Sequence, residues 1–276
     1  MRRWLRHPFR SAAPRVPVVR LQGVIAARGG AGTLSHAAIA PLLERAFRRG
    51  RPRAVALAIN SPGGSPVQSS LVGAHIRRLA DELSVPVHAF VEDVAASGGY
   101  WLAAAADDVW VDESSITGSI GVISAGFGFA DLLARVGIER RVHTAGEDKS
   151  LLDPFRPERP EDVARLHAIQ RRVHAHFIDH VRARRGARLA EGRSLFEGEV
   201  FVGREAVEAG LADGIGHLAP KLRALYGDKV RLVPLGLRRP FLRRLVPSVA
   251  AEDVARGAAL ALDAAEVRAQ WSRYGL

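Results

Sequence analysis

Short apolar runs alternate along this chain with segments whose apolar residues recur every three or four positions. Residues 54–59 are apolar throughout, which is typical of a strand buried on both faces of a sheet, and they run into a turn sequence at residues 60–64. Residues 67–83 then have helical spacing, with arginine and acidic side chains on the outer face. The same order predicts strands at residues 16–21, 85–91, 108–111 and 138–143, and helices at residues 35–48, 97–106 and 131–136. Helices that alternate with buried strands indicate an α/β domain.

A longer helix is predicted over residues 160–185, after these units. Proline and two acidic residues stand at its start, and basic residues followed by Gly186 mark its end. One apolar stripe runs along it, which suggests packing on another subunit: Val163, Leu166, Ile169, Val173, Phe177 and Val181. A histidine group on the same helix is interpreted as a solvated face rather than a metal site, because no acidic ligand accompanies it: His167, His174, His176 and His180.

Composition narrows the class of protein. The 276 residues carry a net charge of +11, and 37 of the 40 basic residues are arginine, a bias that reflects genome composition and does not predict nucleic-acid binding. The absence of cysteine excludes disulfides, thiolate metal sites and a cysteine nucleophile. No apolar run has the length of a signal peptide or a membrane span. We expect a disordered basic leader at residues 1–15, one α/β domain at 16–233 and a basic amphipathic tail at 234–276. The tail either contacts a membrane surface or is solvated or bound to a partner.

A candidate nucleophile lies in the sequence Val-Ala-Ala-Ser-Gly-Gly-Tyr that ends at Tyr100. Its serine, Ser97, stands among small residues where a predicted strand turns into a helix, so its hydroxyl is exposed beside the positive end of that helix. A helix N-cap serine beside packing glycines is the alternative interpretation.

The turn Asn60-Ser-Pro-Gly-Gly-Ser65 offers free backbone N–H groups next to a buried strand. The N–H groups of Gly64 and Gly98 are therefore candidate donors of an oxyanion hole, and a tight turn without a ligand is the alternative.

Lys149 is the candidate general base. A base must lose its proton near neutral pH, which a buried lysine can do and an arginine cannot. This chain has three lysines in all, and Lys221 and Lys229 are interpreted as surface residues. No histidine lies between His88 and His143, so these two are the remaining candidates for a histidine base, and both fall in strand-like runs.

Five segments together resemble signal peptide peptidase A, the protease IV-like family of the Clp/crotonase fold. They are residues 58–64, 95–100, 117–122, the Lys149 segment and residues 202–216, in the family's order, with lysine 52 residues after serine. The resemblance implies an α/β fold of repeated ββα units with a long helix after the core. It also implies Ser97 as nucleophile, Lys149 as base, Ser119 as the residue that orients the lysine, and Gly64 and Gly98 as oxyanion donors. In compact members a neighbouring subunit supplies the lysine within a ring, so we expect a homo-oligomer.

The resemblance implies a serine endopeptidase that hydrolyses apolar peptides such as signal-peptide remnants, without a metal or another cofactor. We expect a cytoplasmic protein that attaches peripherally to the inner face of the membrane, with peptide substrates and no nucleic-acid partner. One alternative is a crotonase-type acyl-CoA enzyme that uses carboxylates such as Glu92 and Asp93 for acid–base chemistry. The other is a catalytically idle oligomeric scaffold.

Overall fold

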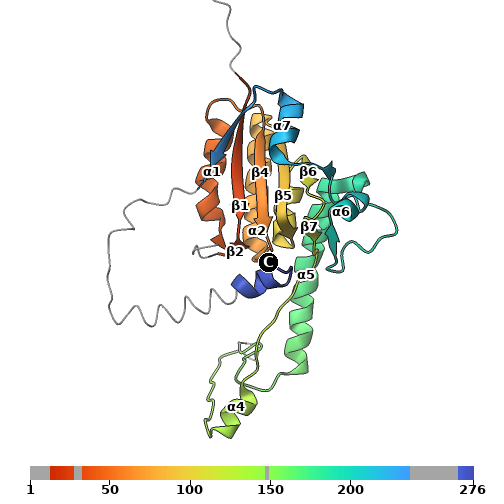
Figure 1. Cartoon of the computed structure of the whole chain (residues 1–276). Helices are drawn as coiled ribbons and strands as arrows, with labels where there is room; N and C mark the ends of the chain where they lie inside the picture. The colour runs from red at the N-terminus through yellow and green to blue at the C-terminus, as the bar shows by residue number, and fades with distance from the viewer. Residues whose placement is uncertain (1–12, 28–32, 147–148, 237–266) are drawn as a thin grey trace, which may run out of the picture.

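The computed structural model describes residues 13–27, 33–146, 149–236 and 267–276. Its main sheet has eight strands, and the path β10-β1-β4-β5-β6-β9 is parallel throughout (Figure 1). The strands on this path are β1 (Arg15–Gln22), β4 (Val55–Ser61), β5 (Val87–Ala96), β6 (Asp108–Val111), β9 (Gly214–Ile215) and β10 (Arg231–Leu235). Off the path, β7 (Ile116–Gly118) pairs with β5 and β8 (Val200–Val202) pairs antiparallel with β7. Parallel neighbours require crossover connections, which the helices supply.

Helices cover both faces of this sheet (Figure 1). The larger apolar cluster lies between the sheet and α1 (His36–Arg48), α2 (Pro66–Leu83) and α3 (Gly98–Ala104). A smaller cluster lies on the opposite face under α7 (Leu218–Tyr226), where Leu222 packs with Phe90. All seven residues of β4 are buried, as its unbroken apolar run predicts for a strand covered on both faces.

Strand β5 changes its neighbour halfway along its length. Its first half pairs with β6 from His88 to Phe90, and its second half pairs with β7 from Val94 to Ala96. On its other edge, the register with β4 shifts between the pairs that contain Ile59 and Ser61. The second half of β5 therefore ends beside β7 and beside the turn that follows β4, which is where the candidate nucleophile lies.

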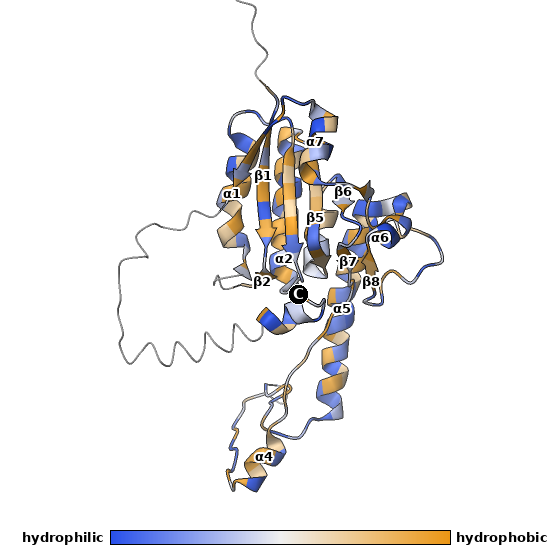
Figure 2. Cartoon of the chain, in the orientation of Figure 1, coloured by the Kyte–Doolittle hydropathy of each residue, from blue (hydrophilic) through white to orange (hydrophobic). Residues whose placement is uncertain are grey.

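A long projection leaves the body of the molecule after β7. We call residues 121–159 the arm; it contains α4 (Ala130–Arg135), and α5 (Pro160–Arg185) leads the chain back to the core (Figure 1). The arm doubles back on itself, since the N–H of Phe129 donates to the carbonyl oxygen of Pro154 at 2.6 Å and the two rings of Phe129 and Phe155 stack. Apolar residues show on α4 and the neighbouring chain (Figure 2), and several are largely exposed: Ile123, Phe127, Leu132, Val136 and Ile138.

The remaining elements connect α5 to the last strand or lie near the start of the chain. The connecting elements include η1 (Gly186–Arg188) and α6 (Arg204–Glu208), and near the start lies the two-stranded sheet of β2 (Val24–Ile25) and β3 (Thr33–Leu34). None of the helices within the described ranges is both long enough and apolar enough to cross a bilayer.

The predicted α/β fold is confirmed, with the long helix following the core units at residues 160–185 as expected. One predicted strand is wrong: residues 138–143 form no strand and lie in the arm, where Arg140 pairs with Asp153. The described sheet begins at Arg15 and ends at Leu235, while most of the predicted leader and most of the predicted tail fall on residues 1–12 and 237–266, outside the described residues.

Candidate active site

Ser97 occupies a sharp turn between β5 and α3. Its backbone has φ 51° and ψ −122°, a conformation that residues with a side chain rarely adopt. The side chain makes no capping hydrogen bond to α3, so the interpretation of Ser97 as a simple N-cap is not supported. The turn is held from the side, because the N–H of Ser97 donates to the carbonyl oxygen of Gly118 at 2.8 Å. A strained backbone with an unengaged hydroxyl is the arrangement expected of an exposed nucleophile.

Helix α3 is anchored deep in the core behind Ser97. Tyr100 is fully buried and its hydroxyl donates to the carbonyl oxygen of Leu211 at 2.8 Å. This burial raises the pKa of the Tyr100 hydroxyl above its ordinary value, so the phenol stays neutral. One turn after the serine, the N–H of Trp101 donates to the Ser97 carbonyl at 3.0 Å. The helix thus fixes the direction of the N–H groups at its start.

The glycine turn after β4 is bonded to β2 in a way that leaves one N–H free. Ile25 donates its N–H to the Gly63 carbonyl and accepts from the Ser65 N–H, both at 2.7 Å. Among the hydrogen bonds of the described residues, the N–H of Gly64 between them has no acceptor. Gly64 has φ +136°, and a Cβ there would collide with the backbone of Ile25, so no other residue fits without moving β2.

The two glycine segments lie in contact. A Cβ on Gly63 would stand 2.8 Å from the Gly98 nitrogen and 2.8 Å from the Ser97 Cβ. Gly98 is the first residue of α3, so its N–H has no acceptor within the helix, and a Cβ at Gly98 would collide with the hydroxyl of Ser69. The predicted donors Gly64 and Gly98 are therefore brought together beside Ser97 with their N–H groups available.

Ser119 lies on the strand next to the nucleophile. In the β5–β7 ladder Ala96 pairs with Gly118, so Ser97 and Ser119 each follow directly on paired residues. Ser119 also has a positive φ of 50°, and its N–H donates to the Glu199 carbonyl at 2.6 Å. The register places Ser119 beside Ser97, and its role in orienting the lysine stays a prediction.

Lys149 lies on the arm and not beside Ser97. It is exposed, and it belongs to the part of the arm between α4 and α5, which projects away from the sheet (Figure 1). Lys149 is not among the residues that line the pocket at Ser97. A single chain thus brings together Ser97, Ser119 and the two glycines, but it does not supply the lysine to them.

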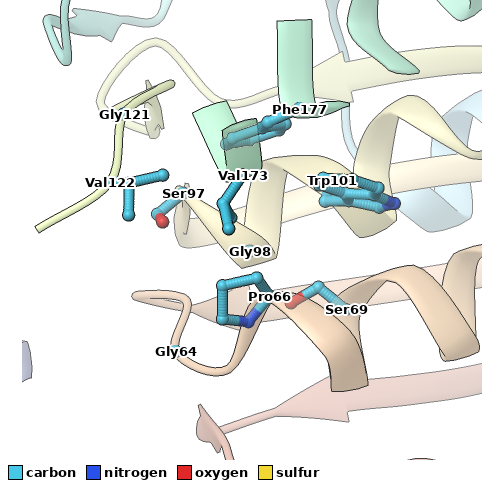
Figure 3. A pocket seen from close by; sticks show the side chains of 10 residues that line it. All are labelled: Gly64, Pro66, Ser69, Ser97, Gly98, Trp101, Gly121, Val122, Val173 and Phe177. Atoms are coloured by element: carbon cyan, nitrogen blue, oxygen red, sulfur yellow. The ribbon is translucent and has the colours of Figure 1, made fainter. Parts of the chain in front are cut away.

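A small pocket opens beside Ser97. Figure 3 shows the serine hydroxyl facing its centre, with Gly64 and Pro66 on one side and Val122 on the other. The lining is mostly apolar and comes from four separate parts of the chain: Gly64, Pro66, Ser69, Ser97, Gly98, Trp101, Gly121, Val122, Val173 and Phe177. Five of the lining residues on these helices were not predicted as site residues: Pro66 and Ser69 on α2, Trp101 on α3, and Val173 and Phe177 on α5. The apolar stripe of α5 was the one signal for Val173 and Phe177, and it suggested packing rather than a pocket.

Two other mechanisms would use either a histidine base or the carboxylates Glu92 and Asp93, and the structure places these side chains away from Ser97. His88 lies at the opposite end of β5 from Ser97, where its ring bonds Asp108 at 2.9 Å and the hydroxyl of Tyr226 at 2.7 Å. His143 is exposed on the arm. Glu92 forms a bidentate ion pair with Arg20 at 2.7 and 2.8 Å, and Asp93 accepts from the Asn60 side chain at 2.5 Å. Within a single chain, neither the histidines nor these carboxylates are therefore placed to act on a group at Ser97, although His143 projects on the same arm as Lys149.

The prediction of a solvated histidine face on α5 is wrong for His174 and His180, while His167 and His176 are exposed as predicted. The ring of His180 stacks on Trp101 with centroids 4.5 Å apart, and its Nε2 donates to the Trp101 carbonyl at 3.0 Å. Desolvation by burial lowers the pKa of His180 to about 4. His174 donates to the carbonyl of Ile120 at 3.1 Å. Both histidines face the core because Phe177 and Val181 on the same helix are buried against it.

Comparison with known proteins identifies the family of this chain. Residues 80–226, more than half of the chain, match the model of peptidase family S49. A Na(+)/H(+) antiporter NhaA of Brucella melitensis biotype 1 is 47% identical over the whole chain, which spans 39% of that protein. The chloroplastic serine protease SPPA of Arabidopsis thaliana is 30% identical over 88% of the chain, which spans 36% of it. Among solved structures, the 1510-N membrane-bound stomatin-specific protease superposes with a TM-score of 0.47 at 13% identity, covering 82% of this chain and 99% of that one. The chain thus spans less than two fifths of the length of both curated relatives.

Proposed function

Because the chain belongs to peptidase family S49, we propose that it is a serine endopeptidase in which Ser97 is the nucleophile and Lys149 the general base. The observation that carries the proposal is the conformation of Ser97, whose unengaged hydroxyl stands beside two free glycine N–H groups. Those groups come from Gly64 and Gly98. A nucleophile and an oxyanion hole are the two parts that acyl transfer requires of a site.

The proposed reaction proceeds through an acyl-enzyme. The neutral amine of Lys149 takes the proton of the Ser97 hydroxyl as the Ser97 Oγ bonds to the peptide carbonyl carbon. The carbonyl oxygen becomes an oxyanion that accepts from Gly64 and Gly98. The C–N bond then breaks, and Lys149 returns the proton to the leaving amine. Water, deprotonated by the same amine, hydrolyses the ester and regenerates Ser97.

We propose that Lys149 acts on the serine of a neighbouring subunit. Two observations support this arrangement: Lys149 projects on the arm, and the arm exposes apolar side chains of which Phe127 is 81% exposed and Ile123 69% exposed. Contiguous exposed apolar surface marks interaction sites in soluble proteins. A homo-oligomer would cover this surface and complete each site, with Ser119 orienting the incoming lysine.

The lining of the pocket supports a preference for peptides with small apolar side chains. The apolar side chains of Trp101, Val122, Val173 and Phe177 line it (Figure 3). Within the described part of the chain, no charged side chain lines it. We therefore propose apolar peptides, such as remnants of cleaved signal peptides, as the substrate class.

We also propose that the protein works in the cytoplasm at the inner face of the membrane. Two features support this setting: the arginine pairs of residues 238–239 and 243–244 beside apolar residues, and the Brucella relative, whose name is that of a membrane transporter. Basic segments with apolar neighbours bind anionic lipid surfaces. The division into a leader at 1–15, a catalytic domain at 16–233 and a tail at 234–276 is part of the same proposal.

Subunit mixing tests the proposal. Ser97→Ala and Lys149→Ala, each purified alone, should not cleave a fluorogenic apolar peptide, because each lacks one half of every site. After the two are mixed and allowed to exchange subunits, sites that pair an intact serine with an intact lysine should restore a fraction of wild-type cleavage. Mixing without any gain would exclude completion between subunits, and cleavage by Ser97→Ala alone would exclude the proposed nucleophile.

A further inference from the structure

The chain segment that follows Ser119 forms one wall of the cleft at Ser97. Gly121 and Val122 line the pocket opposite Gly64 and Pro66 (Figure 3). An extended peptide that reaches Ser97 must therefore pass along this wall. Extended peptides are commonly bound through backbone hydrogen bonds to an exposed strand edge, so the exact position of such a wall decides how well substrate binds.

The wall is attached to the core at its start, where Gly121 lies against Gly198. The side chain of Ile120 is fully buried, and the N–H of Gly121 donates to the Ser119 carbonyl at 3.0 Å. Beyond Val122 the chain enters the arm, where Ile123 is 69% exposed. Because the chain after Val122 continues into the exposed arm, the position of Gly121 and Val122 depends on contacts at Ile120, where the segment leaves the core.

His174 supplies such a contact from α5. Its Nε2 lies 3.1 Å from the carbonyl oxygen of Ile120, and since a carbonyl oxygen only accepts, the imidazole must carry its proton on Nε2 and donate it. His174 is half-buried and directly follows Val173, which lines the same pocket. Helix α5 is itself fastened to the core on the other side of Ser97, where His180 stacks on Trp101 and bonds its carbonyl.

We propose that His174 is a positioning residue for substrate binding: through the Ile120 carbonyl it holds the wall formed by Gly121 and Val122 in register with Ser97. The inference rests on the proposed peptidase function and adds to it a residue that does not touch the reacting atoms. Its loss leaves the nucleophile and the oxyanion hole in place and loosens the surface along which a peptide lies.

The test compares three single variants of the full chain. His174→Ala removes the donor, and His174→Gln keeps an N–H donor at a similar distance from the backbone. His167→Ala is the matched control, since it removes an exposed histidine from the same helix. Should His174→Ala fail to fold, His174→Leu fills the same space without a donor and takes its place.

Two readouts separate positioning from general destabilisation. With a fluorogenic apolar peptide, His174→Ala should raise KM about tenfold and change kcat less than about threefold, while His174→Gln and His167→Ala stay near wild type. Labelling of Ser97 by a small fluorophosphonate, which does not extend along the cleft, should keep its wild-type rate in every variant. An equal fall of kcat and labelling in His174→Ala, or a Gln variant as impaired as the Ala variant, would overturn the inference.

Amide hydrogen exchange tests the same inference without any catalysis. Measured without substrate, the amides of residues 120–123 should exchange at least about fivefold faster in His174→Ala than in wild type or His167→Ala. Unchanged exchange there would refute the role of His174 even in an active enzyme. If wild type cleaved no peptide while exchange rose as expected, the proposed peptidase function would fail and the anchoring of the wall by His174 would stand.

Discussion

The N–H of Ser97 donates to the carbonyl oxygen of Gly118 at 2.8 Å, one residue before Ser119. This bond joins the turn that carries the candidate nucleophile to the strand that carries the candidate lysine-orienting residue. Both serines adopt positive φ angles, 51° at Ser97 and 50° at Ser119, and each directly follows the last residue of a strand of the same ladder. The two halves of the proposed site are thus held in register by backbone bonds, independently of the side chains that would react.

Gly64→Ala should impair acylation. A Cβ at this position collides with the backbone of Ile25 and meets a backbone φ of +136°, so the turn must shift and carry the Gly64 N–H away from the oxyanion. Loss of one oxyanion donor lowers kcat by about 10²–10³-fold, which a peptide-cleavage assay would measure. Gly126→Ala is the control, because a Cβ there has nothing within 4 Å. Wild-type kcat in Gly64→Ala would remove Gly64 from the mechanism.

Phe177→Ala should both destabilise the fold and widen the pocket. The Phe177 side chain is 4% exposed and stacks on Trp101 with centroids 5.0 Å apart. Its removal should lower the free energy of unfolding by about 3–4 kcal/mol, measured by urea denaturation. Leu225→Ala, at a residue 46% exposed on α7, should cost less than about 1 kcal/mol.

The same variant tests the proposed substrate class. Truncation of Phe177 should shift the kcat/KM ratio towards peptides with leucine rather than alanine at the cleaved position, because the wall that limits the pocket is gone. Phe177→Leu, which keeps most of the volume, should shift the ratio less. An unchanged preference in Phe177→Ala would show that this pocket does not receive the substrate side chain.

His180 should make the protein less stable in mild acid. Burial lowers its pKa to about 4 in the folded state, against 6.5 for the free side chain, so the unfolded chain binds more protons between these values. The contribution is present above pH 6.5 and is lost as the pH falls from 6.5 towards 4, a change of about 3 kcal/mol. His180→Gln keeps a donor to the Trp101 carbonyl without titrating, so its unfolding free energy should fall less over this range. Parallel pH profiles for the two proteins would contradict this assignment.

Phe127→Asp and Ile138→Asp should reduce self-association. The two side chains are 81% and 57% exposed on the arm, and a carboxylate in an apolar contact surface is costly to desolvate. Sedimentation velocity should show smaller species, and peptide cleavage should fall in parallel because Lys149 of a neighbour would no longer reach Ser97. Thr144→Asp places the same charge on an exposed polar position of the arm and should change neither. Dissociation without any loss of cleavage would argue against completion between subunits.

The sequence predicted the parts of this molecule that depend on local pattern. The apolar run of β4, the bounds of α5 and the junction at Ser97 follow from burial periodicity, proline and glycine placement and turn chemistry. The candidate donor Gly64 was selected for the same reason, since a glycine pair directly after a buried strand indicates a backbone that must come close to another segment.

What the sequence did not predict depends on contacts between distant segments. Residues 138–143 have a strand-like pattern, but the described part of the arm offers them no neighbouring strand to pair with. The histidines of α5 look solvated along the helix, and only the docking of α5 on Trp101 turns His180 and His174 towards backbone carbonyls. The pocket was missed because its residues come from four separate parts of the chain, which no spacing rule connects.

The most direct test of the central claim is the site of covalent modification. Wild type, Ser97→Ala and Lys149→Ala are treated with a fluorophosphonate probe, and the modified residue is identified by mass spectrometry of the digested protein. The account predicts one adduct on Ser97 in wild type, none in Ser97→Ala, and labelling slowed by at least about 10²-fold in Lys149→Ala, since a general base contributes about 10²–10⁴ to such a step. An adduct on another residue, or labelling of Ser97→Ala at the wild-type rate, would contradict it.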